Sequence, residues 1–250
     1  MSLSVIILAK NEEQNLPRVI KSVDFADEIL VFDDGSIDKT KEIAEKYQAQ
    51  VIKLGQGLDF SEKRNRAMQE AKNEWLLFID ADEEMTKELK TEIISLLERP
   101  EFAAYYLKRR DFFWGKELKH GELKKVYEQG IIRLMKKNSG KWVGKIHEVF
   151  VTGSPTSRLK NFINHYPHPT IKIFLEKVNS YSTQRAQELF DSGKKTNILE
   201  IIFLPWGKFI LNYFIYLGFL DGPAGFVYAF MMSFHSFLVR GKLSEICTSR

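Results

Sequence analysis

The sequence predicts an α/β fold in which a mostly parallel sheet is flanked by helices and followed by a helical region. Four short apolar runs, each typical of a strand buried on both faces, support the sheet: residues 5–8, 29–32, 51–54 and 76–79. The segments between these runs repeat their apolar residues at helical spacing, as in residues 16–23. Short strands that alternate with helices are joined by crossover connections, which produce a parallel sheet.

Polar residues follow three of the four predicted strands: Asn11-Glu12, Asp33-Asp34 and Asp80-Ala81-Asp82. Ligands of parallel sheets bind at the carboxyl ends of the strands. Helix capping would explain any one of these positions. It would not explain three neighbouring ends that carry carboxylates, because these would repel one another without a cation or a hydrogen-bonding ligand. We therefore expect a ligand site along this edge of the sheet.

Asp80 and Asp82 directly follow the apolar run 76–79. Carboxylates two residues apart on extended backbone share a face. Such hard oxygen ligands hold Mg²⁺ or Mn²⁺ while phosphate oxygens fill the remaining positions. The alternative is a solvated turn, since a chain with 33 acidic residues produces such pairs by chance. The position at the end of a buried strand favours a metal site, so Mg²⁺ or Mn²⁺ is the predicted cofactor.

The segments 5–16, 33–40, 63–65 and 78–82 resemble, in order and spacing, the nucleotide-sugar domain of glycosyltransferase family 2, which has the GT-A fold. The resemblance implies a nucleotide sugar as donor, and a role for each polar residue. Asp33 or Asp34 would bond the base, Glu12 would lie by the ribose, and Arg64 would approach the base or diphosphate. Asp80 would face the ribose, and Asp82 the metal. The other predicted donor-site residues are Asn11, Asn65 and Arg133.

The donor is predicted to be a UDP-sugar, because an ionised carboxylate accepts the uracil N–H well; this favours UDP over CMP donors and leaves GDP open. A sugar transfer also needs a general base, since the acceptor hydroxyl has a pKa far above neutrality. Glu148 is the candidate, with His147 beside it, because a tryptophan and two glycines in 140–144 suggest a shaped pocket loop. The alternative for both residues is a surface pair at a strand end.

The stretch from His120 through Arg133 to Glu148 resembles the lipopolysaccharide-core β-glucosyltransferase branch of family 2. The members of that branch use the acidic residue of this region as base and invert the anomeric configuration. The chain departs from the branch at 120–125, where a glycine- and aromatic-rich segment is usual. His165 and His168 lie in a proline-containing segment without a third ligand nearby, so we expect a structured loop there and not a metal site.

The chain changes character after residue 165, and we predict a nucleotide-sugar and acceptor domain at 1–165 and a helical region at 166–250. Residues 170–192 have the spacing of an amphipathic helix. Residues 209–239 are rich in aromatics and carry one formal charge, Asp221, which splits them into two pieces that are each short for a membrane span. This pattern is typical of a helical hairpin in the membrane interface. A dimer surface or a helical layer over the catalytic domain is the alternative.

The resemblance and these features together predict an inverting, metal-dependent hexosyltransferase that moves glucose from UDP-glucose to a lipid-anchored saccharide such as lipopolysaccharide core. We expect it at the cytoplasmic face of the inner membrane, since no signal peptide is evident and Cys247 is the single cysteine. The net charge of +4 is modest, and we expect no nucleic-acid partner. The alternatives are a non-catalytic sugar-nucleotide-binding or membrane scaffold protein, and a polyprenyl-phosphate or protein glycosyltransferase of the same fold.

Overall fold

The computed structural model describes residues 2–55, 57–144 and 148–248. These residues form two compact units: the first comprises 1–110 and 126–165, and the second 111–125 and 166–250. The short segment 111–125 therefore belongs with the C-terminal helices although it lies in the middle of the chain. The predicted division into independent domains at residue 165 stays a prediction.

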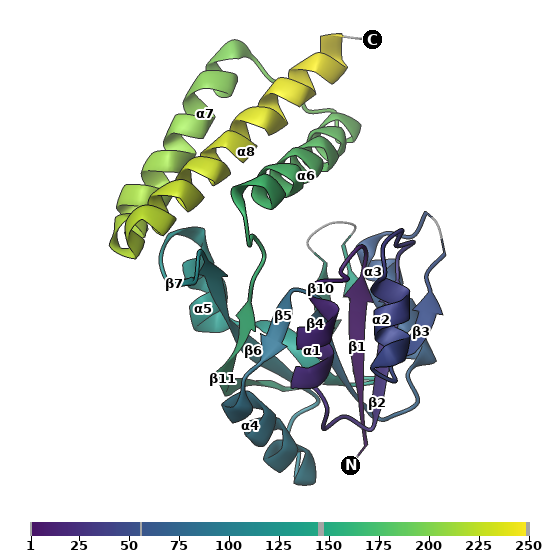
Figure 1. Ribbon diagram of the computed structural model, residues 1–250. Helices are drawn as coiled ribbons and strands as arrows, with labels where there is room; N and C mark the ends of the chain where they lie inside the picture. Colours follow the sequence, from purple (N-terminus) through teal and green to yellow (C-terminus); the bar gives the residue numbers. More distant parts are fainter. Residues whose placement is uncertain (1, 56, 145–147, 249–250) are drawn as a thin grey trace. The chain divides into compact units, whose positions relative to one another are not determined.

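The first unit contains the predicted parallel strands in the order β3-β2-β1-β4 (Figure 1). Their bounds are Leu3–Ala9 for β1, Glu28–Asp33 for β2, Gln50–Lys53 for β3 and Trp75–Asp80 for β4. Helices α1 (Leu16–Ser22), α2 (Thr40–Lys46) and α3 (Phe60–Glu70) connect them. In this register Leu8 of β1 lies opposite both Phe32 of β2 and Asp80 of β4, so the carboxyl ends of the three strands are level.

The later strands extend the same sheet with antiparallel partners, so the sheet is mixed. After β4 come β8 (Ile131–Lys136), β6 (Ala104–Phe113), β11 (Thr156–His165) and β5 (Glu83–Met85), and β7 (Lys116–Leu118) pairs with the end of β6. The parallel prediction holds for the first four strands only. The reason is visible in β11, whose two buried residues, Leu159 and Ile163, lie four positions apart on one face, as in an antiparallel strand with one solvated face.

The core lies on both faces of the sheet. On one face the odd-numbered residues of β1 pack with α1, α2 and α4 (Lys87–Glu98). On the other face Ile6 packs with α3 and with the strands β9 (Gly140–Val143), which contains Trp142, and β10 (Val149–Thr152). Asp59 caps the start of helix α3. Its side chain accepts a hydrogen bond from the Glu62 backbone N–H, and the Glu62 carboxylate accepts one from the Asp59 backbone N–H, as in a capping box.

The antiparallel pair of β9 and β10 is fixed to α3 by one amide side chain. Asn65 donates to the carbonyl of Trp142 (2.8 Å) and accepts from the Trp142 N–H (2.9 Å). The Trp142 ring packs edge-on against Phe78 and Phe150, with centroid separations of 5.2 and 5.5 Å. These contacts hold the segment that carries Glu148 against the sheet. The predicted residue His147 lies outside the described residues.

The second unit is helical apart from β7 and the end of β6. It contains α6 (Ile171–Asp191), α7 (Ile198–Ile210), a π-helical turn η2 (Leu211–Ile215), a 3₁₀ turn η3 (Gly218–Asp221) and α8 (Gly222–Thr248), while the 3₁₀ turn η1 (Gly121–Leu123) leads into α5 (Lys124–Gln129). Helix α6 agrees with the predicted amphipathic helix. The apolar helices are longer than the two predicted pieces: Ile198–Ile215 and Gly218–Thr248 are each long and apolar enough to cross a membrane. The prediction missed this because it began the apolar region at residue 209 and not at Ile198.

A substitution at Gly140 probes how tightly β9 and β10 are packed. A Cβ atom at Gly140 would lie 2.2 Å from the carbonyl oxygen of Val151, whereas one at Gly153 would meet nothing within 4 Å. We expect Gly140→Ala to lower the free energy of unfolding by about 1–3 kcal/mol, the usual cost of overpacking. Gly153→Ala, the matched control, should change it by at most about 0.5 kcal/mol. Denaturant unfolding measures both, and equal stability of the two variants would contradict the observed packing.

Candidate functional site

The level strand ends bring the predicted polar residues together in the first unit. Asn11 adopts a left-handed backbone conformation (φ 56°), which asparagine tolerates better than most residues. Its backbone N–H donates to the Ser36 hydroxyl (2.9 Å), and its side-chain oxygen accepts from the Ile37 N–H (2.9 Å). These bonds fix the loop after β1 to the loop after β2. The Glu12 carboxylate lies in the same loop and accepts from Asn15 at 2.7 Å.

The two aspartates at the end of β2 have different surroundings. Asp33 is buried and accepts a hydrogen bond from the Ser36 N–H at 3.0 Å. Asp34 is more exposed and forms an ion pair with Lys63 of α3 at 2.8 Å, with Lys10 at 3.7 Å. The lysines offset the charge of Asp34, while Asp33 shapes the turn that follows β2.

Asp80 is the centre of a charged network. The Arg64 guanidinium donates to its Oδ1 at 3.0 Å, and Arg133 of β8 binds its Oδ2. Glu83, which is fully buried, accepts the backbone N–H of Asp80 at 2.8 Å and lies 3.4 Å from Arg133. Arg109 of β6 approaches Glu83 at 3.8 Å. Buried carboxylates need such partners, because an unpaired charge in the interior is costly.

The pKa values in this network follow from burial and pairing. Burial alone would raise the pKa of Asp80, but Arg133 and Arg64 outweigh it and hold that pKa well below the usual range. For Glu83 burial dominates and raises the pKa, although Arg133 opposes the shift. Burial would lower the pKa of Arg133, yet the two carboxylates outweigh it and raise that pKa. Asp80 and Arg133 are therefore ionised throughout the physiological pH range.

Glu148 joins this network through Arg64. Its Oε1 accepts from Arg64 Nε at 2.6 Å, although the two residues are 84 positions apart in the sequence. The buried Arg64 guanidinium also lies 4.8 Å from the ring of Trp142. One arginine thus connects the predicted base to Asp80. The structure brings these predicted site residues together, while Asn65 lies nearby with its amide bonded to Trp142; a donor-binding role for Asn65 stays a prediction.

Asp82 has a neighbour that the sequence prediction missed. His165, the last residue of β11, lies opposite Glu83 of β5, and its Nε2 is 3.4 Å from Asp82 Oδ1. We expected a structured loop at His165, because no third ligand lies nearby in the sequence. The residue instead ends a strand, since local spacing does not reveal the antiparallel pairing of β11 with β5. Among residues 2–55, 57–144 and 148–248, no group of three or more His, Cys, Asp or Glu side chains is arranged to hold a metal. Asp82 and His165 could form part of a metal site, since a carboxylate suits Mg²⁺ or Mn²⁺ and histidine is a common metal ligand, with ligand oxygens at the other positions.

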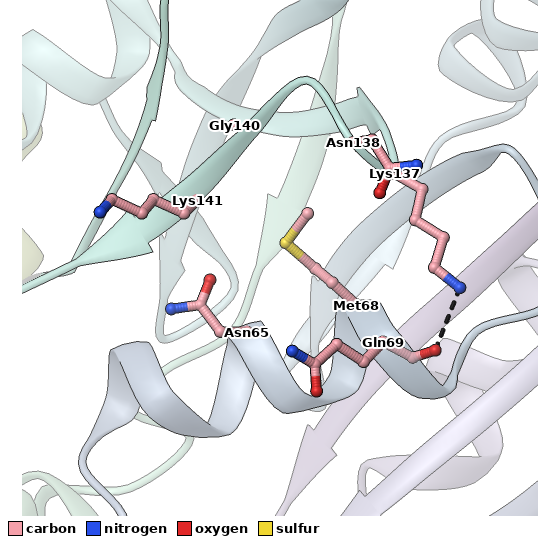
Figure 2. Close-up of a pocket in the computed structure, with 7 residues that line it drawn as sticks. All are labelled: Asn65, Met68, Gln69, Lys137, Asn138, Gly140 and Lys141. Carbon is pink, nitrogen blue, oxygen red and sulfur yellow. Dashed lines mark hydrogen bonds between the residues drawn. The ribbon is translucent and has the colours of Figure 1, made fainter.

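A hollow of about 370 Å³ lies beside this site but is separate from it. Figure 2 shows its lining, which comes from α3 and from the β8–β9 connection: Asn65, Met68, Gln69, Lys137, Asn138, Gly140 and Lys141. Lys137 donates to the carbonyl of Gln69 at 3.0 Å (Figure 2). No carboxylate of the described residues lines this hollow. Since the candidate ligand-binding carboxylates lie at the strand ends, we place the functional site there.

Residues 4–179 match the family described as Glycosyl transferase family 2, which covers well over half of the chain. The chain belongs to glycosyltransferase family 2. The predicted family is thereby confirmed, and so is the predicted fold class, since the family and the α/β sheet agree. This chain is a glycosyltransferase, and its strand-end acids lie within the matched range.

Two relatives of this glycosyltransferase extend over nearly its whole length. An uncharacterized glycosyltransferase of Rickettsia typhi is 30% identical over 260 residues, which cover 98% of this chain and 87% of the relative. The lipopolysaccharide core biosynthesis glycosyltransferase LpsC of Rhizobium meliloti is 27% identical, over 98% of this chain and 93% of that protein. Among solved structures, S. aureus TarS aligns with 74% of this chain and 40% of its own, at 18% identity and a TM-score of 0.49.

The charge balance of this family 2 enzyme predicts that Arg133 is essential for stability. Arg133→Met would leave Asp80 and Glu83 without their shared partner, and we expect it to lower the free energy of unfolding by about 3–5 kcal/mol. Arg158 of β11 is exposed, so the control Arg158→Met should cost at most about 0.5 kcal/mol. Denaturant unfolding at pH 7 compares them. If the two variants are equally stable, Arg133 does not balance the buried carboxylates.

Proposed function

We propose that this glycosyltransferase moves glucose from UDP-glucose to a lipid-anchored saccharide such as lipopolysaccharide core, with inversion at the anomeric carbon. The observation that carries this proposal is the arrangement around Arg64, which contacts Asp80 at one strand end and Glu148 beside it. Donor-binding carboxylates and a candidate base thus lie within reach of one side chain. The family and the lipopolysaccharide-related relative support the same reaction class.

The donor nucleotide would bind across the ends of β1, β2 and β4. In this proposal Asp33 or Asp34 accepts the uracil N–H, which requires an ionised acceptor and disfavours bases that present a lone pair there. Glu12 and Asp80 would lie by the ribose. Lys10 and Lys63, which pair with Asp34, would help to offset the negative charge of the nucleotide.

Asp82 and His165 would hold Mg²⁺ or Mn²⁺ at the diphosphate. A divalent ion supplies charge compensation to the diphosphate as the sugar leaves. The donor set supports this role, because Asp82 and His165 lie together while Asp80 is already bound by two arginines. We therefore assign the metal to Asp82 and His165, and leave Asp80 to the ribose.

Glu148 would take the proton of the acceptor hydroxyl as that oxygen attacks the anomeric carbon. Arg64 holds Oε1 of Glu148, and we propose that Oε2 is the atom that accepts the proton. Attack from the side opposite to the departing diphosphate inverts the configuration. The acceptor would be presented by the cytoplasmic face of the inner membrane, a location that the long apolar helices α7 and α8 support.

Asp82→Asn should abolish metal-dependent UDP binding and lower the transfer rate by about 10²–10³-fold, because charge compensation at the leaving group is lost. Isothermal titration with UDP, in Mn²⁺ and in EDTA, measures the binding. The control Glu88→Gln removes an exposed carboxylate of α4 and should leave both properties unchanged. Transfer at the wild-type rate in excess EDTA would refute the metal role.

Glu148→Gln should leave UDP-glucose affinity nearly unchanged and slow transfer by about 10²–10⁴-fold, since the amide keeps the shape and loses the basicity. Single-turnover kinetics with a lipid-linked saccharide separates the two effects. An active Glu148→Gln variant together with an inactive His147→Ala variant would move the base to His147. A wild-type protein that binds UDP-glucose and never turns it over would favour the non-catalytic scaffold.

A further inference from the structure

A broad apolar face covers α7 and continues onto η2 and α8 in the second unit. Its exposed side chains include Leu199, Phe203, Trp206, Phe214, Ile215 and Phe230. Phe203 and Trp206 are 64% and 65% exposed, and the one buried residue of α7 is Pro205. A large apolar surface that no other part of its unit covers marks an interaction site.

The opposite side of α8 is covered by α6 along its length. Phe174 and Val178 pack with Ala224 and Met231 near the start of α8, and Ala186 and Leu189 pack with Val239 and Leu243 near its end. Lys242 adds a polar connection, since its ammonium donates to the Asn179 carbonyl and the Thr183 hydroxyl, both at 2.7 Å. Helix α6 therefore moves with α8 as one body.

The outward side of α6 is charged. Lys172, Glu176 and Arg185 are exposed there. If α8 crossed a bilayer, these charges would have to enter the hydrocarbon with it, which is strongly unfavourable. The three-helix layer consequently has one side that suits lipid and one side that suits water.

The connection between η2 and α8 is also hydrogen-bonded to the backbone N–H groups of residues 119–121. The Asp221 carboxylate accepts the N–H groups of Lys119 (3.1 Å) and His120 (3.0 Å), and the Tyr216 carbonyl accepts the N–H of Gly121 (3.0 Å). The segment 111–125 carries several charges and continues into the sheet through β6. A hairpin that spans the membrane would need to pull this segment through the bilayer.

We propose that α7, η2 and the lipid-facing side of α8 form a monotopic anchor, which lies in the plane of one leaflet with its apolar side in the acyl chains. Exposed Lys194 and Lys195 precede α7, and their charge complements anionic headgroups. This charge favours a bilayer over a second copy of the chain as the occupant. The inference deepens the proposed membrane location, but its tests do not require sugar transfer, so either one can fail alone.

Vesicle flotation tests the occupant. Full-length protein is mixed with vesicles of phosphatidylglycerol and phosphatidylcholine, and the bound fraction is measured at low salt. We expect Phe203→Glu/Trp206→Glu to reduce the bound fraction at least about tenfold, because the change puts two charges into the apolar side. The control Ile94→Glu, at a 44% exposed residue of α4, should float like the wild type. Circular dichroism and thermal unfolding of each variant verify that it is folded.

The wild-type protein remaining in the soluble fraction, as a monomer or as a dimer that the double variant abolishes, would overturn the proposal. So would full flotation of the double variant.

Trp206 then distinguishes an in-plane helix from a spanning one. It lies near the middle of 198–215, so a spanning helix would place it at the bilayer centre, whereas an in-plane helix keeps it close to the headgroups. The emission of Trp206 is obtained by subtracting the spectrum of Trp206→Phe from that of the wild type. Stronger quenching by lipids brominated near the headgroup than by lipids brominated near the chain ends supports the monotopic anchor. The reverse order would overturn it.

Discussion

Arg133 is buried between Asp80 and Glu83, and the acidic edge of the sheet depends on it. Without a cation in that position, the carboxylate of Asp80 at the end of β4 and the fully buried carboxylate of Glu83 in β5 would lose the cation that they share. The arginine comes from β8, which pairs directly with β4. The pairing of those strands and the charge balance of the site therefore depend on the same register. The register that buries the core also places the Arg133 guanidinium beside the two carboxylates.

The two halves of the sheet contribute different groups to the site. The parallel half supplies the carboxylates at the ends of β1, β2 and β4. The antiparallel half supplies Arg133, Arg109 and His165. Arg64, from α3, is the link to Glu148, which directly precedes β10. An acidic edge of this kind attracts a cation or a basic side chain, and here the protein provides basic side chains around Asp80 while Asp82 lies beside a histidine.

The sequence was sufficient for the parallel half of the fold, because continuous apolar runs and helical spacing are local signals. Asp33, Asp34 and Asp80 could be placed at one edge for the same reason. Glu83 was not recognised, since nothing in its neighbours distinguishes a fully buried glutamate from a solvated one. His165 was expected in a loop but ends a strand, because its register partner Glu83 lies 82 positions earlier (165 minus 83), across an antiparallel pairing that no local pattern specifies. The length of α7 was underestimated at Ile198–Leu204, where helical spacing and apolar content both continue past the expected boundary.

The place where the two units meet along the chain has a practical consequence. His165 ends β11 and the first unit, and Tyr166 begins the second stretch of the helical unit. A shortened protein that stopped at residue 165 would carry a free terminal carboxylate on the very residue that lies beside Asp82, and so would add a negative charge where we propose that the diphosphate binds. It would also keep 111–125, whose partners in the helical unit would be gone. The catalytic half of this chain is therefore difficult to isolate by trimming, and a soluble version is better sought by replacing surface residues of α7.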